Sequence, residues 1–234
     1  MIKFKALTWV TMIILLIVAS CACVTNEEKE INALRPSIVN VVDLIGQARG
    51  TGWVAVIDGQ HVIMSAKHIF GGREEVLDTP IVGDCLVSIK DWNGREALTS
   101  ILSYDDSWDL DVDRASDWII LRCPEEWEDL PALELSSESP RFGENAIYIG
   151  FGDTSSAAVA DRVIMCDEYG DSGLRRISGN FGAGASGSPI YDPDLGVVGM
   201  LVMVYVDSSC GIVLDIPALY DQIIDEYNND VVDF

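Results

Sequence analysis

The sequence is short of histidine and of basic residues, and both shortages narrow the range of functions. Its 234 residues include two histidines, and 15 lysines and arginines stand against 38 aspartates and glutamates, for a formal net charge of −23. A chain this acidic repels phosphates, so we expect no nucleic acid partner. An acidic surface is typical of a soluble protein and also attracts cationic substrates. No close-spaced cysteine pair accompanies a histidine, so we expect no metal and no cofactor.

The chain also lacks internal repeats and low-complexity stretches, which excludes solenoid and disordered classes. Its length suits one domain or two small barrels that share a cleft, and 49% hydrophobic residues can bury a sizeable core. Helical periodicity occurs essentially once in the body of the chain. An αβα sandwich, which needs repeated helices, is therefore excluded.

Residues 1–24 have the features of an export signal. Lys3 and Lys5 precede an apolar run from Ala6 to Ala19. The run ends in Val18-Ala19-Ser20-Cys21, which resembles the bacterial lipobox, where the cysteine is lipidated and becomes the new N-terminus. An ordinary cleaved signal and a retained membrane anchor remain open as alternatives.

All three interpretations export the rest of the chain. Residues 25–35 are then a tether, and residues 36–234 form a domain of the cell envelope on the periplasmic or extracellular side. The lipidated and anchored forms attach that domain to the membrane through its N-terminus.

Four cysteines lie in the body of the chain, and an even number in an exported protein predicts two disulfides. These are Cys85, Cys123, Cys166 and Cys210. The first two flank the region of Asp117 and the last two flank the region of Ser186. One bridge in each half is therefore the pairing that we expect, with free buried thiols as the alternative.

Short apolar segments between turn residues predict an all-β fold. We expect strands at 37–42, 52–57, 61–66, 86–89, 98–102 and 118–121, and then at 146–150, 162–165, 189–191, 197–204 and 211–216. A polar stretch at 124–138 separates the two groups. Apolar residues at helical spacing predict one helix, at 217–227.

Three polar residues that stand beside these strands form a candidate catalytic set. Glycines bracket Ser186 in the segment Gly184 to Pro189, which permits a backbone to approach a substrate carbonyl closely. A serine needs a base and an orienting acid to become a nucleophile. His68 follows the strand at 61–66, and Asp117 directly precedes the apolar run at 118–121, so the order of histidine, aspartate and serine indicates a catalytic triad.

The chain resembles the trypsin-like (chymotrypsin-fold) serine peptidases, and most closely the bacterial HtrA-type catalytic domains without a PDZ domain. The resemblance covers about residues 36–225. Six motifs carry it in order: Gly50 to Val54, Val62 to Ile69, Asp117 to Leu121, Phe142 to Gly150, Gly184 to Pro189, and Gly211 to Pro217. It implies two six-stranded antiparallel β-barrels, about 36–123 and 140–216, with the active site between them and a C-terminal helix.

By this resemblance Ser186 is the nucleophile, His68 the general base and Asp117 the residue that orients the imidazole. The backbone amides of Gly184 and Ser186 form the oxyanion hole. The implied activity is that of a serine endopeptidase, which cuts protein or peptide substrates through an acyl-enzyme. The alternative is a catalytically inactive trypsin-like domain that binds partners at the cell envelope.

Several alternatives to these residues are weaker. Asp117 competes with five nearby aspartates, of which Asp109 is the runner-up; the other four are Asp105, Asp106, Asp111 and Asp113. The glycine spacing does not suit Ser188 as a nucleophile, and His61 reads as an exposed polar residue. An α/β-hydrolase is excluded because both histidines precede Ser186.

Two departures from the family lie beside Ser186, at Ala185 and at Ser188, which replaces the more usual glycine. Ala185 stands where digestive members carry an aspartate that pairs with a newly cleaved N-terminus, so activation of that kind is not expected. Asn180 is placed at the base of the substrate pocket, with Val202, Met203 and Val204 along one wall. Because no acidic residue lies at that base, we expect a small or medium apolar side chain beside the scissile bond.

Overall fold

The computed structural model describes residues 26–44, 48–70, 87–104, 116–151, 159–168, 173–205 and 209–231. The chain divides into two units, Met1–Ala33 and Leu34–Phe234. The first contributes helix α2 (Asn26–Leu34). Among the described residues no helix is both long and apolar enough to cross a membrane. The proposed signal segment with Cys21 lies outside these residues.

The larger unit begins with a sheet of eight strands that wraps into a barrel. Its strands are β1 (Ile38–Asp43), β2 (Arg49–Ile57), β3 (Gln60–Ser65), β4 (Val87–Asp91), β5 (Glu96–Thr99), β6 (Ile101–Tyr104), β7 (Ile119–Arg122) and β8 (Leu133–Glu134). Seven pair antiparallel in the order β5-β4-β1-β2-β3-β7-β6, and β8 joins β2 in parallel. Short 3₁₀ turns are formed by Arg35–Ser37 (η1), Lys67–Phe70 (η2) and Glu125–Trp127 (η4).

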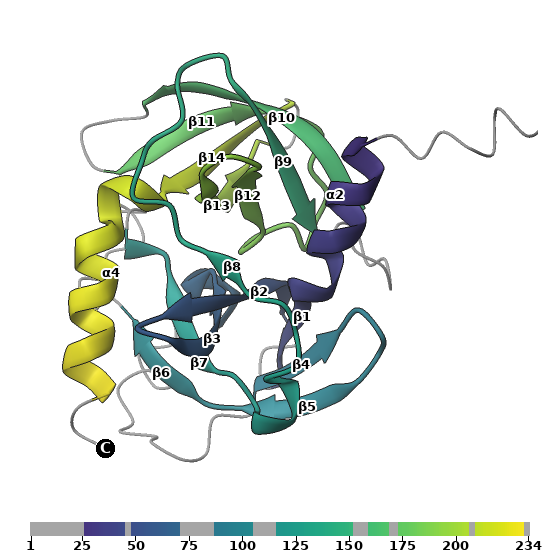
Figure 1. Ribbon diagram of the computed structural model, residues 1–234, viewed down its shortest axis with the longest axis vertical. Helices are drawn as coiled ribbons and strands as arrows, with labels where there is room; N and C mark the ends of the chain where they lie inside the picture. Colours follow the sequence, from purple (N-terminus) through teal and green to yellow (C-terminus); the bar gives the residue numbers. More distant parts are fainter. Residues whose placement is uncertain are drawn as a thin grey trace, which may run out of the picture. The chain divides into compact units, whose positions relative to one another are not determined.

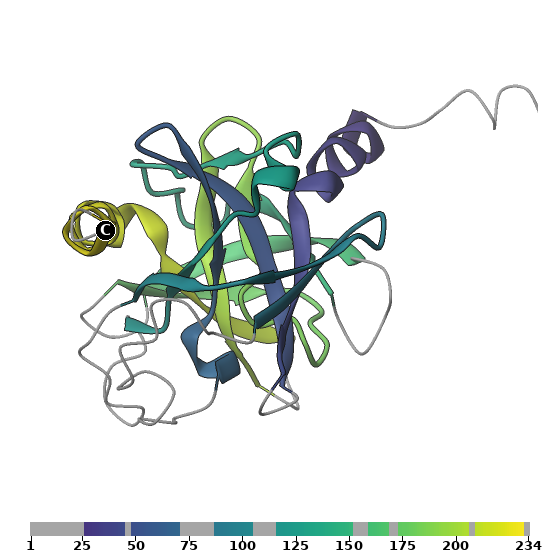
Figure 2. The ribbon, with the colours of Figure 1, turned by 90° about the horizontal axis from the view of Figure 1, so that it is seen from below.

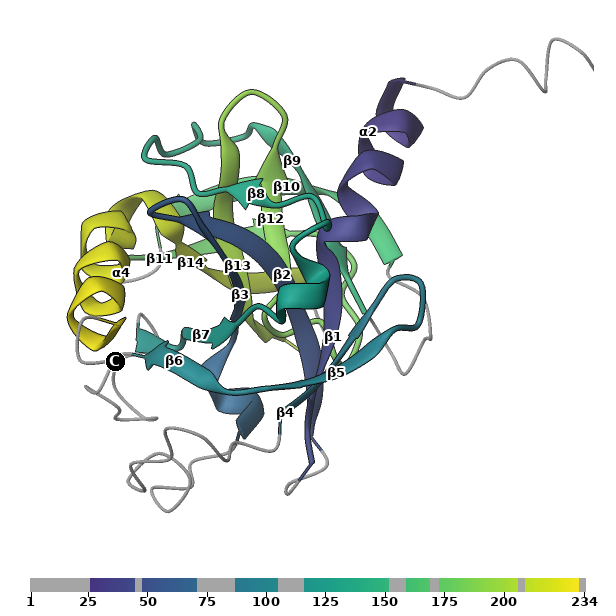
Figure 3. The same cartoon turned by 60° about the horizontal axis from the view of Figure 1, so that its bottom comes forward.

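The two edges of this sheet are consecutive parts of one bent strand. β5 pairs with β4 and β6 pairs with β7, yet only Ser100 separates β5 from β6. Figure 3 shows β5 running on into β6. The sheet therefore closes through this bend, and with β5 and β6 counted together the antiparallel barrel has the six strands that the family resemblance implies.

The second barrel closes directly. Its strands are β9 (Asn145–Gly150), β10 (Val159–Glu168), β11 (Leu174–Ser178), β12 (Pro189–Asp192), β13 (Gly196–Val204) and β14 (Cys210–Asp215). They pair antiparallel in the closed order β10-β11-β14-β13-β12-β9 (Figure 1). The all-β prediction with two barrels is confirmed.

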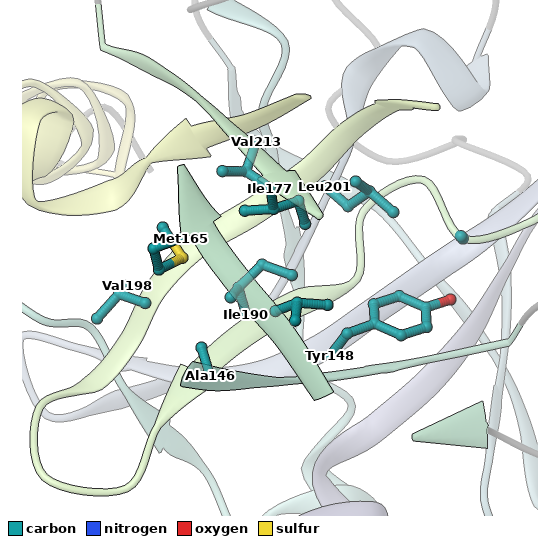
Figure 4. Packing of buried hydrophobic residues seen from close by; sticks show 10 residues of the cluster. Ala146, Tyr148, Met165, Ile177, Ile190, Val198, Leu201 and Val213 are labelled. Atoms are coloured by element: carbon teal, nitrogen blue, oxygen red, sulfur yellow. The ribbon is translucent and has the colours of Figure 1, made fainter. Parts of the chain in front are cut away.

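Alternating residues of these strands fill the second barrel with apolar side chains. Figure 4 shows this cluster, whose members are Ala146, Tyr148, Val163, Met165, Ile177, Ala185, Ile190, Val198, Leu201 and Val213. Nine of them come from strands. Ala185 comes from the loop before Ser186 and is only 1% exposed. That loop is thus anchored in the barrel core by a small apolar side chain.

The predicted C-terminal helix is α4 (Ile216–Val231), and it packs on both barrels. It contacts β6 of the first barrel and β13 of the second, and Figures 1 and 2 show it at one side of the two barrels. The Tyr227 hydroxyl donates to Gln60 Oε1 of the first barrel at 2.9 Å. In the second barrel, a Cβ at Gly173 would lie 2.9 Å from the Leu219 side chain. The helix therefore ties the barrels together away from their shared site.

Two strands were missed by the sequence analysis. β8 has only two residues and lies in the stretch that reads as a polar linker. β11 carries Arg175 and Arg176 side by side, which breaks the alternation of apolar and polar residues that predicts a strand.

Arg175 of β11 is held by a largely buried ion pair with Asp215, at the junction of β14 and α4. Its Nε donates to Asp215 Oδ2, and its Nη1 donates to the Pro140 carbonyl at 2.9 Å. The two charged side chains are 12% and 6% exposed. Through Arg175, the Pro140 segment that leads into the second barrel is thus tied to Asp215 at the end of the last strand of that barrel.

We expect Arg175→Met to lower the free energy of unfolding by about 3 kcal/mol, because it leaves the Asp215 carboxylate buried without its partner. Lys90→Met is the matched control. It removes a cation from an exposed pair with Glu96, whose side chains are 49% and 64% exposed, and costs about 0–1 kcal/mol. Urea denaturation of the three proteins measures both values, and equal losses would contradict the assignment.

Candidate active site

His68 lies between a carboxylate and a serine hydroxyl. Its Nδ1 is 2.6 Å from Asp117 Oδ2, and its Nε2 is 2.8 Å from Ser186 Oγ. The backbone N–H of His68 donates to Asp117 Oδ1 at 2.8 Å. The three residues selected from the sequence therefore meet where the first barrel faces the second.

Two paired strands bring His68 and Asp117 together. β3 and β7 pair with Ser65 opposite Ile119. His68 lies in the 3₁₀ turn that follows β3, and Asp117 lies two residues before β7. Trp118 is fully buried and anchors this aspartate to the core. The competing aspartates at 105, 106, 109, 111 and 113 lie outside the described residues.

The hydrogen bonds define the role of each ring nitrogen. Asp117 is only 5% exposed, and a carboxylate accepts hydrogen bonds without donating them. Nδ1 of His68 must therefore carry the proton in this pair. In the neutral ring, Nε2 is then free to accept a proton from Ser186 Oγ, which is the arrangement that activates a serine.

The loop around Ser186 presents two unused amides. Within the described part of the chain, neither the Gly184 N–H nor the Ser186 N–H donates a hydrogen bond. Gly184 has φ +87° and Gly187 has φ +84°, and a Cβ at Gly187 would lie 2.0 Å from the Thr51 carbonyl oxygen. Glycine is therefore required at both positions of this loop.

Ser188 is not available as a nucleophile. Its side chain is fully buried, and a Cβ at Gly150 would lie 1.9 Å from its Oγ and 3.0 Å from the Tyr148 hydroxyl. Burial raises the pKa of Tyr148 to about 12, although the neighbouring Ser188 hydroxyl lowers it in part. Both hydroxyls are enclosed away from solvent, and neither makes a hydrogen bond within the described residues.

His61 lies apart from this site. It lines a cleft of about 670 Å³ at the far ends of β3 and β7, together with Cys123 and Tyr227. It is half-buried, and its Nδ1 is fully enclosed, so the sequence-based reading of an exposed residue is wrong.

The predicted disulfide between Cys166 and Cys210 is not formed in the structure, which corrects that prediction. Cys166 lies on β10 and Cys210 on β14, and both strands pair with β11, which separates them. Two strands with a third strand between them lie about 9–10 Å from each other, which is too far for a disulfide. Cys123 is also a free thiol, and Cys85 lies outside the described residues.

Two of the free thiols, Cys123 and Cys166, are poor nucleophiles. Burial raises the pKa of Cys123 to about 11, with Glu128 and Glu126 adding to the effect, and burial also raises the pKa of Cys166. Both thiols are therefore protonated and weakly nucleophilic near neutral pH. No group of three metal-ligating side chains occurs in these residues.

The residues assigned to the substrate pocket differ in exposure. Asn180 is exposed, Val202 is 1% exposed, and Val204 is partly buried against the second barrel core. The neighbouring Phe181, which the sequence analysis did not select, packs edge-on against Tyr148 with ring centroids 5.2 Å apart.

Lys67 was also missed. It precedes His68, is fully buried, and holds its Nζ 5.0 Å from the centre of the Tyr104 ring. Lysine normally lies at the surface, so no sequence signal indicates this placement.

A family model described as a trypsin-like peptidase domain matches residues 50–200, which include all three residues of the hydrogen-bonded set. The chain belongs to this family. A comparison of this chain with curated proteins found no match.

Solved structures share the fold of this trypsin-like peptidase. The active form of the Rv3671c protease from M. tuberculosis is 20% identical with a TM-score of 0.62, covering 84% of this chain and 83% of its own. The serine endoprotease from Yersinia pestis is 16% identical with a TM-score of 0.67, covering 89% and 69%. A human astrovirus serine protease is 16% identical with a TM-score of 0.55, covering 78% and 90%.

Proposed function

We propose that this trypsin-like peptidase domain is an exported serine endopeptidase in which Ser186, His68 and Asp117 form the catalytic triad. The observation that carries the proposal is the unbroken hydrogen-bonded line from Asp117 through His68 to Ser186, with both links between 2.6 and 2.8 Å. A protein or peptide is the substrate class that the fold family supports.

In this mechanism Ser186 Oγ attacks the carbonyl carbon of the scissile bond, and its proton passes to His68 Nε2. The carbonyl oxygen becomes an oxyanion, which accepts hydrogen bonds from the N–H groups of Gly184 and Ser186. Collapse of the tetrahedral intermediate breaks the C–N bond, and the amine leaves with the proton from Nε2. Water then attacks the acyl-enzyme by the same route and releases the acid.

Asp117 keeps its charge throughout. Its Oδ2 accepts a hydrogen bond from the Nδ1–H group of His68, and its charge stabilises the positive imidazolium that forms during attack. Because its second oxygen accepts from the His68 backbone N–H, the carboxylate and the ring share one fixed orientation.

We expect the purified protein to react covalently with a fluorophosphonate probe at Ser186, because the probe requires an activated serine. Ser186→Ala abolishes labelling, and Asp117→Asn lowers kcat by about 10⁴-fold because the imidazole then takes the wrong tautomer. Mass spectrometry of the labelled peptide identifies the site.

Ser188→Ala is the matched control for this experiment. It removes a buried hydroxyl two residues away and leaves labelling intact. A folded wild-type protein that does not react would contradict the endopeptidase proposal and would favour a domain that only binds partners.

Phe181 supports a pocket for small apolar side chains. Its ring lies between two glycines of neighbouring strand ends: a Cβ at Gly179 would be 2.7 Å from its Cζ, and a Cβ at Gly211 would be 3.2 Å from its Cε2. The ring also packs against the core cluster of the second barrel, which includes Ala185 of the Ser186 loop. The segment from Ser178 to Pro189 contains no acidic residue, so we propose a small or medium apolar residue before the scissile bond.

We expect Phe181→Ala to shift that preference toward larger apolar residues. Removing the ring enlarges the pocket, so kcat/KM for a leucine substrate rises about tenfold relative to an alanine substrate. Phe142→Ala is the control, since it removes an exposed ring of the same barrel, 72% exposed. A peptide library measures both variants, and a wild-type preference for arginine or lysine would contradict this pocket.

Export to the cell envelope is also part of the proposal, and it is supported by the signal features of residues 1–24. We expect the mature protein to begin at a lipidated Cys21 and to partition into the membrane fraction. Intact-mass measurement from the native host tests this, with Cys21→Ser as the variant that loses the lipid. A full-length chain from Met1 in the soluble fraction would contradict export.

A further inference from the structure

Thr51 of β2 joins the first barrel to the Ser186 loop of the second. It is fully buried. Its backbone N–H donates to the Ser186 carbonyl at 2.8 Å, and its Oγ1 donates to the Gly184 carbonyl at 3.0 Å. The same Oγ1 accepts a hydrogen bond from the Phe151 N–H at 2.9 Å. One residue therefore makes three hydrogen bonds across the interface of the barrels.

The two carbonyls that Thr51 holds belong to the residues whose amides would bind the oxyanion. The peptide between Gly184 and Ala185 is fixed at both ends, since the Ala185 N–H donates to the Gly182 carbonyl at 3.2 Å. The peptide after Ser186 is fixed as well, because the Gly187 N–H donates to the Leu201 carbonyl at 2.7 Å. Each of these peptides adjoins the one that carries the Gly184 or the Ser186 N–H, and so limits how far those amides can turn. The peptide that carries the Ser186 N–H is also held directly, because the Ser188 N–H donates to the Ala185 carbonyl at 3.0 Å.

Thr51 is in turn positioned by the strand that leads to His68. Ser65 Oγ donates to the Thr51 carbonyl at 2.8 Å, and Ser65 stands opposite Gly52 in the pairing of β2 with β3. Ser65 lies three residues before His68. Thr51 thus connects the element that carries the base with the loop that carries the nucleophile.

We propose that Thr51 is a positioning residue, whose hydroxyl holds the oxyanion-binding amides in the orientation that the transition state requires. This inference rests on the proposed peptidase function. The Thr51 hydroxyl donates one hydrogen bond and accepts another. Valine has the same shape but can make neither bond, so it cannot replace threonine. Serine keeps both hydrogen bonds and does replace it.

The backbone bond from Thr51 to Ser186 survives any substitution. Thr51→Val therefore releases only the Gly184 carbonyl and the Phe151 N–H, and it leaves the nucleophile near His68. Because the oxyanion forms after substrate binds, the loss falls on kcat rather than on KM. We expect kcat to fall about 10- to 100-fold, as for a small displacement of catalytic groups.

The experiment compares wild type, Thr51→Val, Thr51→Ser and Thr99→Val by steady-state kinetics on one peptide substrate. Thr99→Val is the matched control: Thr99 is also buried in the first barrel, and its hydroxyl donates to the Arg122 carbonyl, away from the site. We expect Thr51→Ser and Thr99→Val to keep kcat within about threefold of wild type.

A second measurement separates positioning from loss of folding. A peptide boronate forms a tetrahedral adduct that uses the oxyanion hole, whereas the product peptide does not. Thr51→Val should weaken boronate binding by about the same factor as kcat and leave product binding unchanged. Equal weakening of both ligands, or an unchanged kcat in Thr51→Val, would overturn the inference.

The outcomes also distinguish this inference from the proposed function. If wild type does not react with a fluorophosphonate, the peptidase proposal itself fails. If wild type reacts and folded Thr51→Ser loses more than about tenfold in kcat, the hydroxyl is not what positions the loop. That second result overturns the role of Thr51 alone.

Discussion

The site depends on how the Ser186 loop is held against the first barrel. His68 and Asp117 are fixed to each other by the paired strands β3 and β7, but Ser186 belongs to a different barrel. Its place is set from two sides, by the Thr51 N–H on its carbonyl and by Ala185 buried in the second core. The 2.8 Å contact between Ser186 Oγ and His68 Nε2 follows only because both constraints act together.

The apolar anchor has a further consequence for the loop. In digestive relatives the residue before the serine is an aspartate that waits for a new N-terminus to pair with it. Here the side chain at that place is a methyl group packed among Tyr148, Ile190 and Leu201. Hydrophobic burial needs no cleavage to form, so we expect the loop to reach this conformation without cleavage of the N-terminus.

Most of the fold and the meeting of His68, Asp117 and Ser186 could be predicted because their signals are local. His68, Asp117 and Ser186 each adjoin a strand-like run, and their order limited the choice. The Cys166–Cys210 bridge was wrong because strand order, which places β11 between the two, cannot be read from the positions of cysteines along the chain. Thr51 and Phe181, to which we assign roles by proposal, were not selected from the sequence for a related reason. Thr51 bonds to Phe151, which lies 100 residues later in the chain. Phe181 packs between Gly179 and Gly211, which closure of the barrel brings together. Neither contact leaves a pattern in the sequence.

The net charge of the protein would act on a substrate over a longer distance than the proposed pocket at Phe181. A net charge of −23 attracts cationic proteins during encounter, an effect that falls with salt over about 10 Å. In the pocket that we propose, the residue accepted beside the scissile bond is instead chosen by the space around Phe181. The two preferences are therefore separable. Salt would change the rate of association with a basic protein, whereas by our proposal the cleaved bond within it depends on Phe181.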